Sequence, residues 1–224
     1  MSSVSRPLVI FGAGQIAELA CFYFTHDSDY TPVAFVVDRE FIQVDTLMGL
    51  PVIPFDEMAQ RFPPNEVHVF VALSYAKVNA VRASKFEAVR SAGYQCASYV
   101  SSRATVFPDF QVGSNCFILE DNTIQPFVKI GDNVTLWSGN HIGHHSTIED
   151  HCFVSSHVVV SGGVRIGPKC FIGVNSTIRD HVSIGERCVI GAGSLIDQDA
   201  GPEGVYTAVA AERSRVPSSR LRSI

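Results

Sequence analysis

Apolar side chains recur at every sixth residue through the second half of the chain. From Val106 to Ile196 each position of this series is a branched aliphatic residue. An α-helix repeats its faces every 3.6 residues and a strand every two, so neither element accounts for the period. The series is Val106, Val112, Ile118, Ile124, Ile130, Leu136, Ile142, Ile148, Val154, Val160, Ile166, Ile172, Ile178, Ile184, Ile190 and Ile196.

The six-residue period predicts a parallel β-helix. Each hexad supplies one short strand and one corner, three hexads make a triangular coil of about 18 residues, and the aliphatic side chains stack inside. At about 4.8 Å between stacked strands, about five coils give a prism about 25 Å long. Glycine often follows the aliphatic residue, and we expect these glycines to supply corners with positive φ. They are Gly113, Gly131, Gly143, Gly167, Gly173, Gly185 and Gly191.

The cysteines follow the same repeat. Four of them are separated by whole coils at one inward position, which predicts a stacked ladder of small apolar groups. A metal site is the alternative for this set, and the ladder interpretation implies no metal. The four are Cys116, Cys152, Cys170 and Cys188. Cys21 and Cys96 lie in apolar segments nearer the N-terminus and are expected to be buried thiols.

Ahead of the repeat, apolar runs alternate with amphipathic segments. This order predicts strands at residues 7–14, 32–38, 51–54, 66–73 and 95–100, with helices at 16–24 and 77–91. Alternating strands and helices predict an α/β domain of the Rossmann-like kind, too short for the second half of a dinucleotide fold. We therefore expect an N-terminal domain over residues 1–103, a β-helix over 104–201 and a tail over 202–224.

The first predicted strand runs into a glycine turn, Gly12-Ala13-Gly14-Gln15, and Asp38 ends the next strand. Glycines at such a turn let backbone N–H groups and a helix N-terminus approach a phosphate, and the acid can accept a hydrogen bond from a ribose or base. The alternative is a tight strand-to-helix turn that binds nothing.

Composition narrows the class of protein. The chain has 224 residues, of which 46% are hydrophobic, enough for buried cores in one or two domains. A formal net charge of −5 gives no general basic surface and argues against a nucleic-acid partner. The start, Met1 to Ser5, belongs to no apolar run long enough for a signal peptide or membrane span, so we expect a cytoplasmic protein.

Three of the eight histidines cluster at His141, His144 and His145. A histidine titrates near neutral pH and suits a general base that takes a proton from an attacking amine or hydroxyl. The alternative is that these are solvated corner residues of the β-helix. His151, which aligns with Lys169 and Arg187, is interpreted as part of a solvated outer face.

A hexapeptide repeat behind an α/β unit resembles the bacterial sugar acyltransferases of the left-handed β-helix type. The pattern is most similar to nucleotide-linked amino-sugar N-acetyltransferases and sialic-acid O-acetyltransferases, and the resemblance covers nearly the whole chain. It implies left-handed coiling and an acetyl-CoA-dependent N-acetyltransferase that acts on a UDP-, GDP- or dTDP-linked amino sugar in surface-glycan synthesis. It also implies a homotrimer with active sites between subunits, without a covalent intermediate or a metal.

The resemblance also assigns roles to the histidines. The family motif is Ile-Glu-His followed by Asp or Glu, and Ile142-Gly143-His144-His145 occupies its place. His144 would be the base, and His145 stands where relatives carry the acid that orients it.

In relatives the N-terminal domain holds the nucleotide-linked sugar. The resemblance places Gly12, Ala13, Gly14 and Gln15 against the diphosphate or sugar. Asp38 and Arg39 would hold the base or ribose. Relatives often carry a histidine in this turn, whereas this chain has Gln15 and Ile16.

In relatives acyl-CoA lies between two adjacent prisms, against backbone groups that correspond by register to Gly162, Val174 and Ala192. The Gly162 N–H would donate to the thioester carbonyl oxygen, and plain corner geometry is the alternative for all three. Trp137, Asn140 and His141, one hexad before the base, are expected at the sugar, with a subunit contact as the alternative for Trp137. The tail arginines, Arg213, Arg215, Arg220 and Arg222, either meet CoA phosphates or only solubilise the tail.

Three other functions remain open at this stage. The same machinery would serve an O-acetyltransferase of the sialic-acid type. A trimeric hexapeptide scaffold or sugar-nucleotide sensor would keep the fold without catalysis. An NAD-binding regulatory module would use only the first domain.

Overall fold

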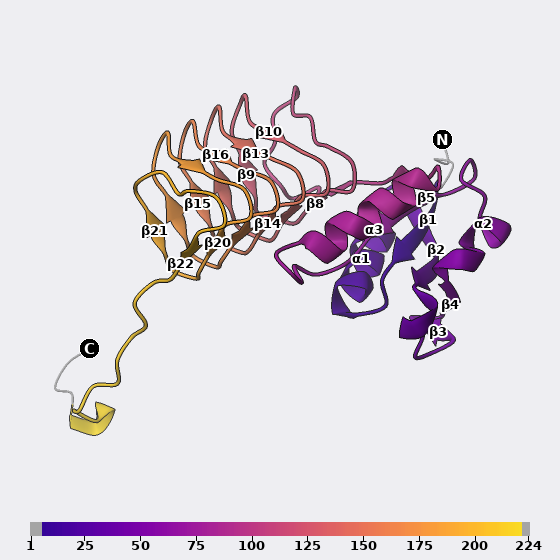
Figure 1. The fold of residues 1–224 in the computed structure, drawn as a ribbon, viewed down its shortest axis with the longest axis horizontal. Coiled ribbons are helices and arrows are strands. Elements are labelled where there is room, and N and C mark those ends of the chain that lie inside the picture. Colours follow the sequence, from indigo (N-terminus) through magenta and orange to yellow (C-terminus); the bar gives the residue numbers. More distant parts are fainter. Residues whose placement is uncertain (1–5, 221–224) are drawn as a thin grey trace.

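The computed structural model describes residues 6–220 and shows an α/β domain beside a β-helix (Figure 1). Residues 1–5 and 221–224 lie outside the described residues, and with them the Met1–Ser5 start and Arg222 of the basic tail. None of the helices between residues 6 and 220 combines the length and apolar character needed to cross a bilayer.

A six-stranded sheet forms the N-terminal domain, with strand order β3-β4-β2-β1-β5-β6. Neighbouring strands are parallel except for the antiparallel pair β3 and β4. The strands are β1 Arg6–Phe11, β2 Tyr30–Val37, β3 Thr46–Leu47, β4 Leu50–Pro54, β5 His68–Val71 and β6 Gln95–Cys96. The helices are α1 Gln15–His26, α2 Met58–Arg61 and α3 Ala80–Ser91, with 3₁₀ turns η1 Arg39–Phe41 and η2 Phe55–Glu57. The expected helices and strands are therefore present, except that residues 95–100 do not form one strand: Gln95–Cys96 joins this sheet, and Tyr99–Val100 pairs with Phe117–Ile118 of the β-helix.

Helices cover both faces of this sheet, because side chains along β1 alternate between two apolar clusters. Leu8 and Ile10 pack with residues of α1, whereas Val9 and Phe11 pack in the cluster that contains Val89 of α3. A parallel sheet buried on both faces needs nearly continuous apolar strands, which is the pattern that the sequence shows.

The β-helix consists of three faces of stacked two-residue parallel strands. The first face has strand order β22-β20-β17-β14-β11-β8-β7, the second β21-β18-β15-β12-β9, and the third β10-β13-β16-β19. The strands are β7 Tyr99–Val100, β8 Phe117–Ile118, β9 Thr123–Ile124, β10 Lys129–Ile130, β11 Thr135–Leu136, β12 His141–Ile142, β13 Thr147–Ile148, β14 Phe153–Val154, β15 Val159–Val160, β16 Arg165–Ile166, β17 Phe171–Ile172, β18 Thr177–Ile178, β19 Ser183–Ile184, β20 Val189–Ile190, β21 Leu195–Ile196 and β22 Val205–Tyr206. The aliphatic series from Ile118 to Ile196 is buried in the core, as predicted.

The corners differ from the sequence-based expectation. Positive φ occurs three residues after each aliphatic position, at every sixth residue from Asn115 to Gly193. The glycines directly after the aliphatic residue have no positive φ and lie against the next coil instead. A Cβ on Gly143, for example, would stand 2.5 Å from the carbonyl carbon of Ser161. The expectation was therefore wrong for Gly113, Gly131, Gly143, Gly167, Gly173, Gly185 and Gly191, because close stacking of coils excludes a side chain there.

Both ends of the repeat depart from the predicted register. Val106 is 37% exposed, so the first hexad does not stack in the core, whereas Val112 of the next hexad bridges Ile130 and packs against the core. At the other end Val189 pairs with Phe171 on one side and Val205 on the other, so the last coil is two residues shorter. The coil thus extends to Tyr206, beyond residue 201. The segment that follows is exposed and ends in a 3₁₀ turn, η3 Ser218–Arg220.

The N-terminal domain packs against the first face of the β-helix (Figure 1). Each strand of that face presents one outward side chain per coil, which gives a row that includes Phe117, Phe153 and Phe171. The Tyr23 ring lies 5.8 Å from Phe117, and Tyr75 packs on Phe153 and Phe171 at 5.0 and 4.7 Å. The corner between the second and third faces is left uncovered, and we call residues 125–128, 143–146, 161–164 and 179–182 the open edge.

Arg82 of α3 is the central polar contact between the two domains. Its side chain is 1% exposed and donates to the backbone carbonyls of Asn133, His151 and Cys152 and to the Oδ1 atoms of Asn79 and Asn133. Among residues 6–220 no carboxylate accepts from it, and burial lowers the pKa of Arg82 to about 10. The guanidinium therefore acts by satisfying corner carbonyls that the domain interface removes from water.

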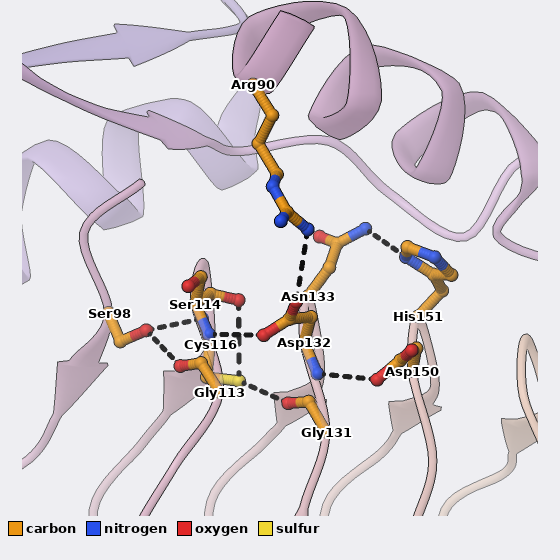
Figure 2. Close-up of polar contacts among 10 residues, drawn as sticks. All are labelled: Arg90, Ser98, Gly113, Ser114, Cys116, Gly131, Asp132, Asn133, Asp150 and His151. Carbon is orange, nitrogen blue, oxygen red and sulfur yellow. Dashed lines mark hydrogen bonds and ion pairs between the residues drawn. The ribbon is translucent and has the colours of Figure 1, made fainter. Parts of the chain in front are cut away.

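Figure 2 shows how Asn133 and His151 fix each other beside this contact. Asn133 Oδ1 accepts from Arg82 and Asn115, so its Nδ2 is the atom that donates to His151 Nδ1, at 2.9 Å. His151 is thus neutral with Nδ1 as acceptor, and burial lowers its pKa. The interpretation of His151 as part of a solvated face was wrong, because α3 covers it and the Phe86 ring lies 5.8 Å away.

The substitution Arg82→Ala is expected to lower the free energy of unfolding by about 3 kcal/mol, because buried carbonyl groups lose a charged donor. Arg90→Ala is the control, since it removes only the exposed ion pair with Asp132 at 3.3 Å (Figure 2) and should cost less than about 1 kcal/mol. Urea unfolding measures both, and equal losses would contradict the assigned role of Arg82.

The half-buried His151 predicts that the free energy of unfolding falls in mild acid. Its pKa in the folded chain lies below the ordinary value of 6.5, so the unfolded chain binds the proton more readily as the pH falls below that value. His151→Asn replaces the ring with a side chain that does not titrate and that already occurs one coil earlier, at Asn133. The variant should flatten the pH dependence of the unfolding free energy below about pH 6.5. An unchanged pH dependence in His151→Asn would contradict the role assigned to this ring.

Candidate functional site

A cavity of about 480 Å³ lies at the end of β1 in the N-terminal domain. The structure brings Gly12, Ala13, Gly14 and Asp38 together in its wall, next to Lys85. The rest of the wall is mainly apolar and consists of Phe11, Val37, Phe41, Gln43, Val44, Leu47, Val52, Leu73 and Val81. The cavity therefore combines an apolar body with one charged pair, which is typical of a small-molecule site.

Packing requires glycine at one of the two glycine positions of the turn but not at the other. Gly12 has a φ of +130°, and a Cβ there would stand 2.7 Å from the carbonyl oxygen of Ala72, so packing alone requires glycine. Gly14 is extended, with a φ of −100°, and no atom lies within 4 Å of its Cβ position. Nothing in the chain demands glycine at this position, and the space in front of the α1 N-terminus is open.

The charged pair of the cavity is Asp38 with Lys85, whose Nζ lies 2.7 Å from the carboxylate. Arg39, which was expected to hold the base or ribose with Asp38, does not line the cavity, because Asp56 and Glu57 accept from it at 2.9 and 2.8 Å. Gln15 is exposed at the start of α1 and does not line the cavity. Lys85 escaped the sequence analysis because it belongs to α3 and to no motif.

The histidine pair lies at the open edge of the β-helix. The Nδ1 atoms of His144 and His145 are 3.2 Å apart, with the rings at 85°. Gln125 Oε1 accepts from the His144 backbone N–H at 2.8 Å, and the Phe127 ring packs on His145 at 4.7 Å. Since one Nδ1 must carry the shared proton, a His144 that donates it has an unprotonated Nε2 that can accept a proton.

Gly162 makes room for the His144 ring. A Cβ there would stand 2.6 Å from Cε1 and 2.8 Å from Nε2 of His144. The Gly162 N–H donates to Asp180 Oδ1 at 2.9 Å. The expectation that this N–H is available to a thioester oxygen is therefore not met in the single chain, and a carboxylate at that place would repel a developing oxyanion.

Val174 and Ala192 lie at a different corner, between the first and second faces. They are separated from Gly162 by whole hexads but not by whole coils, so they cannot share its edge within one chain. Both residues are exposed, and their N–H groups have no acceptor in the part of the chain that the structure describes. This corner therefore offers two free backbone donors.

The residues one hexad before His144 do not form a group around it. Trp137 packs into the apolar cluster shared with the N-terminal domain, and its ring lies 6.3 Å from Phe153. Asn140 is 2% exposed and binds the carbonyl of Trp137 and the N–H of Val158. Only His141 is outward and partly exposed, on the second face. Trp137 and Asn140 do not lie beside His144 within one chain, because six residues along the coil lead to another edge, and their contact with a sugar stays a prediction.

The cysteine ladder is confirmed as a packing feature. Cys116, Cys152, Cys170 and Cys188 are all fully buried and unpaired. Each thiol donates to a carbonyl oxygen of the adjoining corner, as Cys152 does to Gly167 at 3.1 Å. Among the residues that the structure places, no group of three or more His, Cys, Asp or Glu side chains could hold a metal ion.

The cavity and the histidine pair face different sides of the chain. The cavity belongs to the domain that covers the first face, and the open edge is the corner opposite that face. Between residues 6 and 220 no hydrogen bond, ion pair or ring contact joins a cavity residue to His144 or His145. One chain thus presents two separate candidate sites.

Residues 109–143, 128–162 and 163–198 match the family described as bacterial transferase hexapeptide (six repeats). No curated protein sequence matches the chain. The expected resemblance is thus confirmed for the repeat, and solved structures extend it to the fold of both domains.

Three solved structures are similar over most of their length and of this chain. A perosamine N-acetyltransferase from Caulobacter crescentus, in complex with CoA and GDP-perosamine, is 22% identical, with 95% of this chain and 98% of that chain covered and a TM-score of 0.82. The acetyltransferase domain of PglB from Neisseria gonorrhoeae is 21% identical, with 91% and 97% covered and a TM-score of 0.79. WeeI from Acinetobacter baumannii is 17% identical, with 89% and 95% covered and a TM-score of 0.76. At these identities the likeness shows a shared fold.

The substitution Gly162→Ala is expected to displace the His144 ring without unfolding the chain, because the new methyl group meets the end of a movable side chain. A crystal structure of the variant should show a changed His144 rotamer, with a melting temperature close to that of the unaltered chain. Gly201→Ala is the control, since no atom lies within 4 Å of its Cβ position. An unmoved His144 ring in Gly162→Ala would contradict the assigned packing.

Proposed function

We propose that this chain, whose residues 109–198 carry the bacterial transferase hexapeptide repeat, is an acetyl-CoA-dependent N-acetyltransferase for a nucleotide-linked amino sugar. The observation that carries the proposal is the His144–His145 pair at the uncovered edge of the β-helix. Its support is the fold shared with a perosamine N-acetyltransferase that binds CoA and GDP-perosamine. Surface-glycan synthesis in the cytoplasm is the setting that this activity would serve.

His144 is the general base of the proposed reaction. The sugar amine attacks the thioester carbonyl carbon, the C–N bond forms, and the amine proton passes to His144 Nε2. The C–S bond then breaks, and the departing thiolate of CoA takes a proton back from His144. His145 Nδ1 accepts the proton of His144 Nδ1 and so holds the ring in the required tautomer. An amine acceptor needs less assistance from a base than a hydroxyl does.

The N-terminal cavity is the proposed site for the nucleotide half of the substrate. Its apolar wall suits a base, and the open space at Gly14 before α1 suits a phosphate. Lys85, paired with Asp38, adds a positive charge for the diphosphate or an edge of the base. This proposal takes the domain as a Rossmann-like nucleotide-sugar domain.

The separation of the two candidate sites supports a homotrimer of left-handed β-helices with active sites between subunits. The open edge of one subunit would face the cavity of the next. CoA would lie between that edge and the neighbour's corner at Val174 and Ala192, whose free N–H groups can donate to its amide carbonyls. Gly162 keeps its role beside His144, and the oxyanion is not assigned to its N–H because Asp180 occupies it.

The activity is tested by thiol release from acetyl-CoA across UDP-, GDP- and dTDP-linked 3-amino and 4-amino sugars. We expect turnover on at least one amino sugar, and a fall of about 10²-fold in His144→Ala because the amine proton loses its acceptor. His181→Ala is the control on the same edge and should retain activity. Turnover only on hydroxyl sugars would replace the proposal with O-acetylation. An unchanged rate of CoA release in His144→Ala would contradict the assignment of His144 as the general base.

A further inference from the structure

The chain lacks an acid directly after His144, yet a carboxylate reaches the same place from another coil. We propose that Asp180 is the carboxylate partner of His144, a positioning residue that stabilises the protonated ring during acyl transfer. This inference rests on the proposed function of His144 as the base. It gives the open edge the negative charge that a histidine at position 145 cannot supply.

The two side chains converge on Gly162. The ring of His144 lies over this residue, with Cε1 and Nε2 2.6 and 2.8 Å from the position that a Cβ would take. Asp180 Oδ1 accepts from the N–H of the same residue at 2.9 Å. The backbone nitrogen and a Cβ are bonded to one Cα and lie about 2.5 Å apart. The imidazole and the carboxylate therefore both lie against Gly162, although among residues 6–220 they form no direct ion pair with each other.

A missing side chain makes this approach possible. Gly162 is the only glycine at the third position of a hexad between Val106 and Ile196. The next residue is Gly163, where a Cβ would stand 2.4 Å from His181 Nδ1, so the two glycines leave space for two rings. A side chain at residue 162 would meet the His144 ring and displace it from this corner. The glycine is thus explained by the pair that it admits, without a role in CoA binding.

The same backbone contact occurs elsewhere on the β-helix without a histidine. At the corner between the third and first faces, Asp150 Oδ1 accepts from the Asp132 N–H at 2.8 Å, and Asp132 Oδ1 accepts from the Ser114 N–H at 2.7 Å (Figure 2). An aspartate that reaches back one coil is therefore a general way to satisfy a corner N–H. Asp180 differs because its corner also holds the ring of His144, and Asp150 provides a matched control.

The charge of Asp180 is available to the ring. Among residues 6–220 it forms no ion pair, although Arg179 and His181 flank it in the sequence. His145 is the other titratable group that faces His144, and it contacts Nδ1. In the exposed single chain, water weakens the attraction between carboxylate and imidazolium. A second subunit and the substrate would exclude that water and strengthen it.

The substitution Asp180→Asn tests the pair, because it keeps an oxygen that can accept from Gly162 and removes only the charge. We expect kcat/KM at pH 7 to fall about 10-fold, as for loss of a supporting carboxylate. The acid limb of the pH–kcat/KM profile should move to lower pH by about half a unit. Asp150→Asn should change neither quantity. Asp180→Glu, which restores the charge, should recover part of the activity.

A second readout is independent of the substrate. In the full-length protein, the His144 ring resonances followed by NMR should respond at lower pH in Asp180→Asn than in the unaltered chain, and at an unchanged pH in Asp150→Asn. If the unaltered protein transfers no acetyl group, the proposed function fails, and the NMR titration still decides whether Asp180 acts on His144. Identical His144 titrations in all three proteins would overturn the inference.

Discussion

The contact between the N-terminal domain and the first face of the β-helix decides how this molecule is organised. A three-faced prism has equivalent edges until something covers one face, and here the aromatic row and the buried Arg82 fix which face is covered. That contact leaves the opposite edge, with its histidine pair, open to solvent. It also holds the cavity of the N-terminal domain on the far side from this edge. The separation of the cavity from the histidine pair therefore follows from which face of the β-helix the N-terminal domain covers.

The sequence predicted the fold well, because the six-residue period directly encodes strand, core and stacking. It could not predict the consequences of three-fold geometry. Residues one hexad apart look adjacent in the sequence but lie at different edges, so Trp137 and Asn140 do not lie beside His144 within one chain. Lys85 could not be found either, because its partnership with Asp38 arises only when α3 packs over the end of β2.

Small residues illustrate the same limit. A glycine in a repeat suggests a left-handed corner, yet at Gly143 the reason is close stacking and at Gly162 it is the ring of His144. The positive φ angles belong instead to positions such as His145 and His151, which a sequence pattern marks only as polar. Sequence alone therefore indicated which residues were unusual, and the stacked coils gave the physical reason for each.

The central claim is that a second copy of the chain completes the site, and subunit complementation tests it most directly. Gly14→Phe would fill the cavity mouth, where no atom lies within 4 Å of the Cβ position, and His144→Ala removes the base. Each variant alone should be inactive. The two variants should be unfolded together in equal amounts and refolded, and should then recover about a quarter of full activity. In random assembly, about a quarter of the head-to-tail interfaces join an intact cavity on one subunit to an intact histidine on the next. No recovery from mixed oligomers would contradict the account and place both halves of the site within one chain.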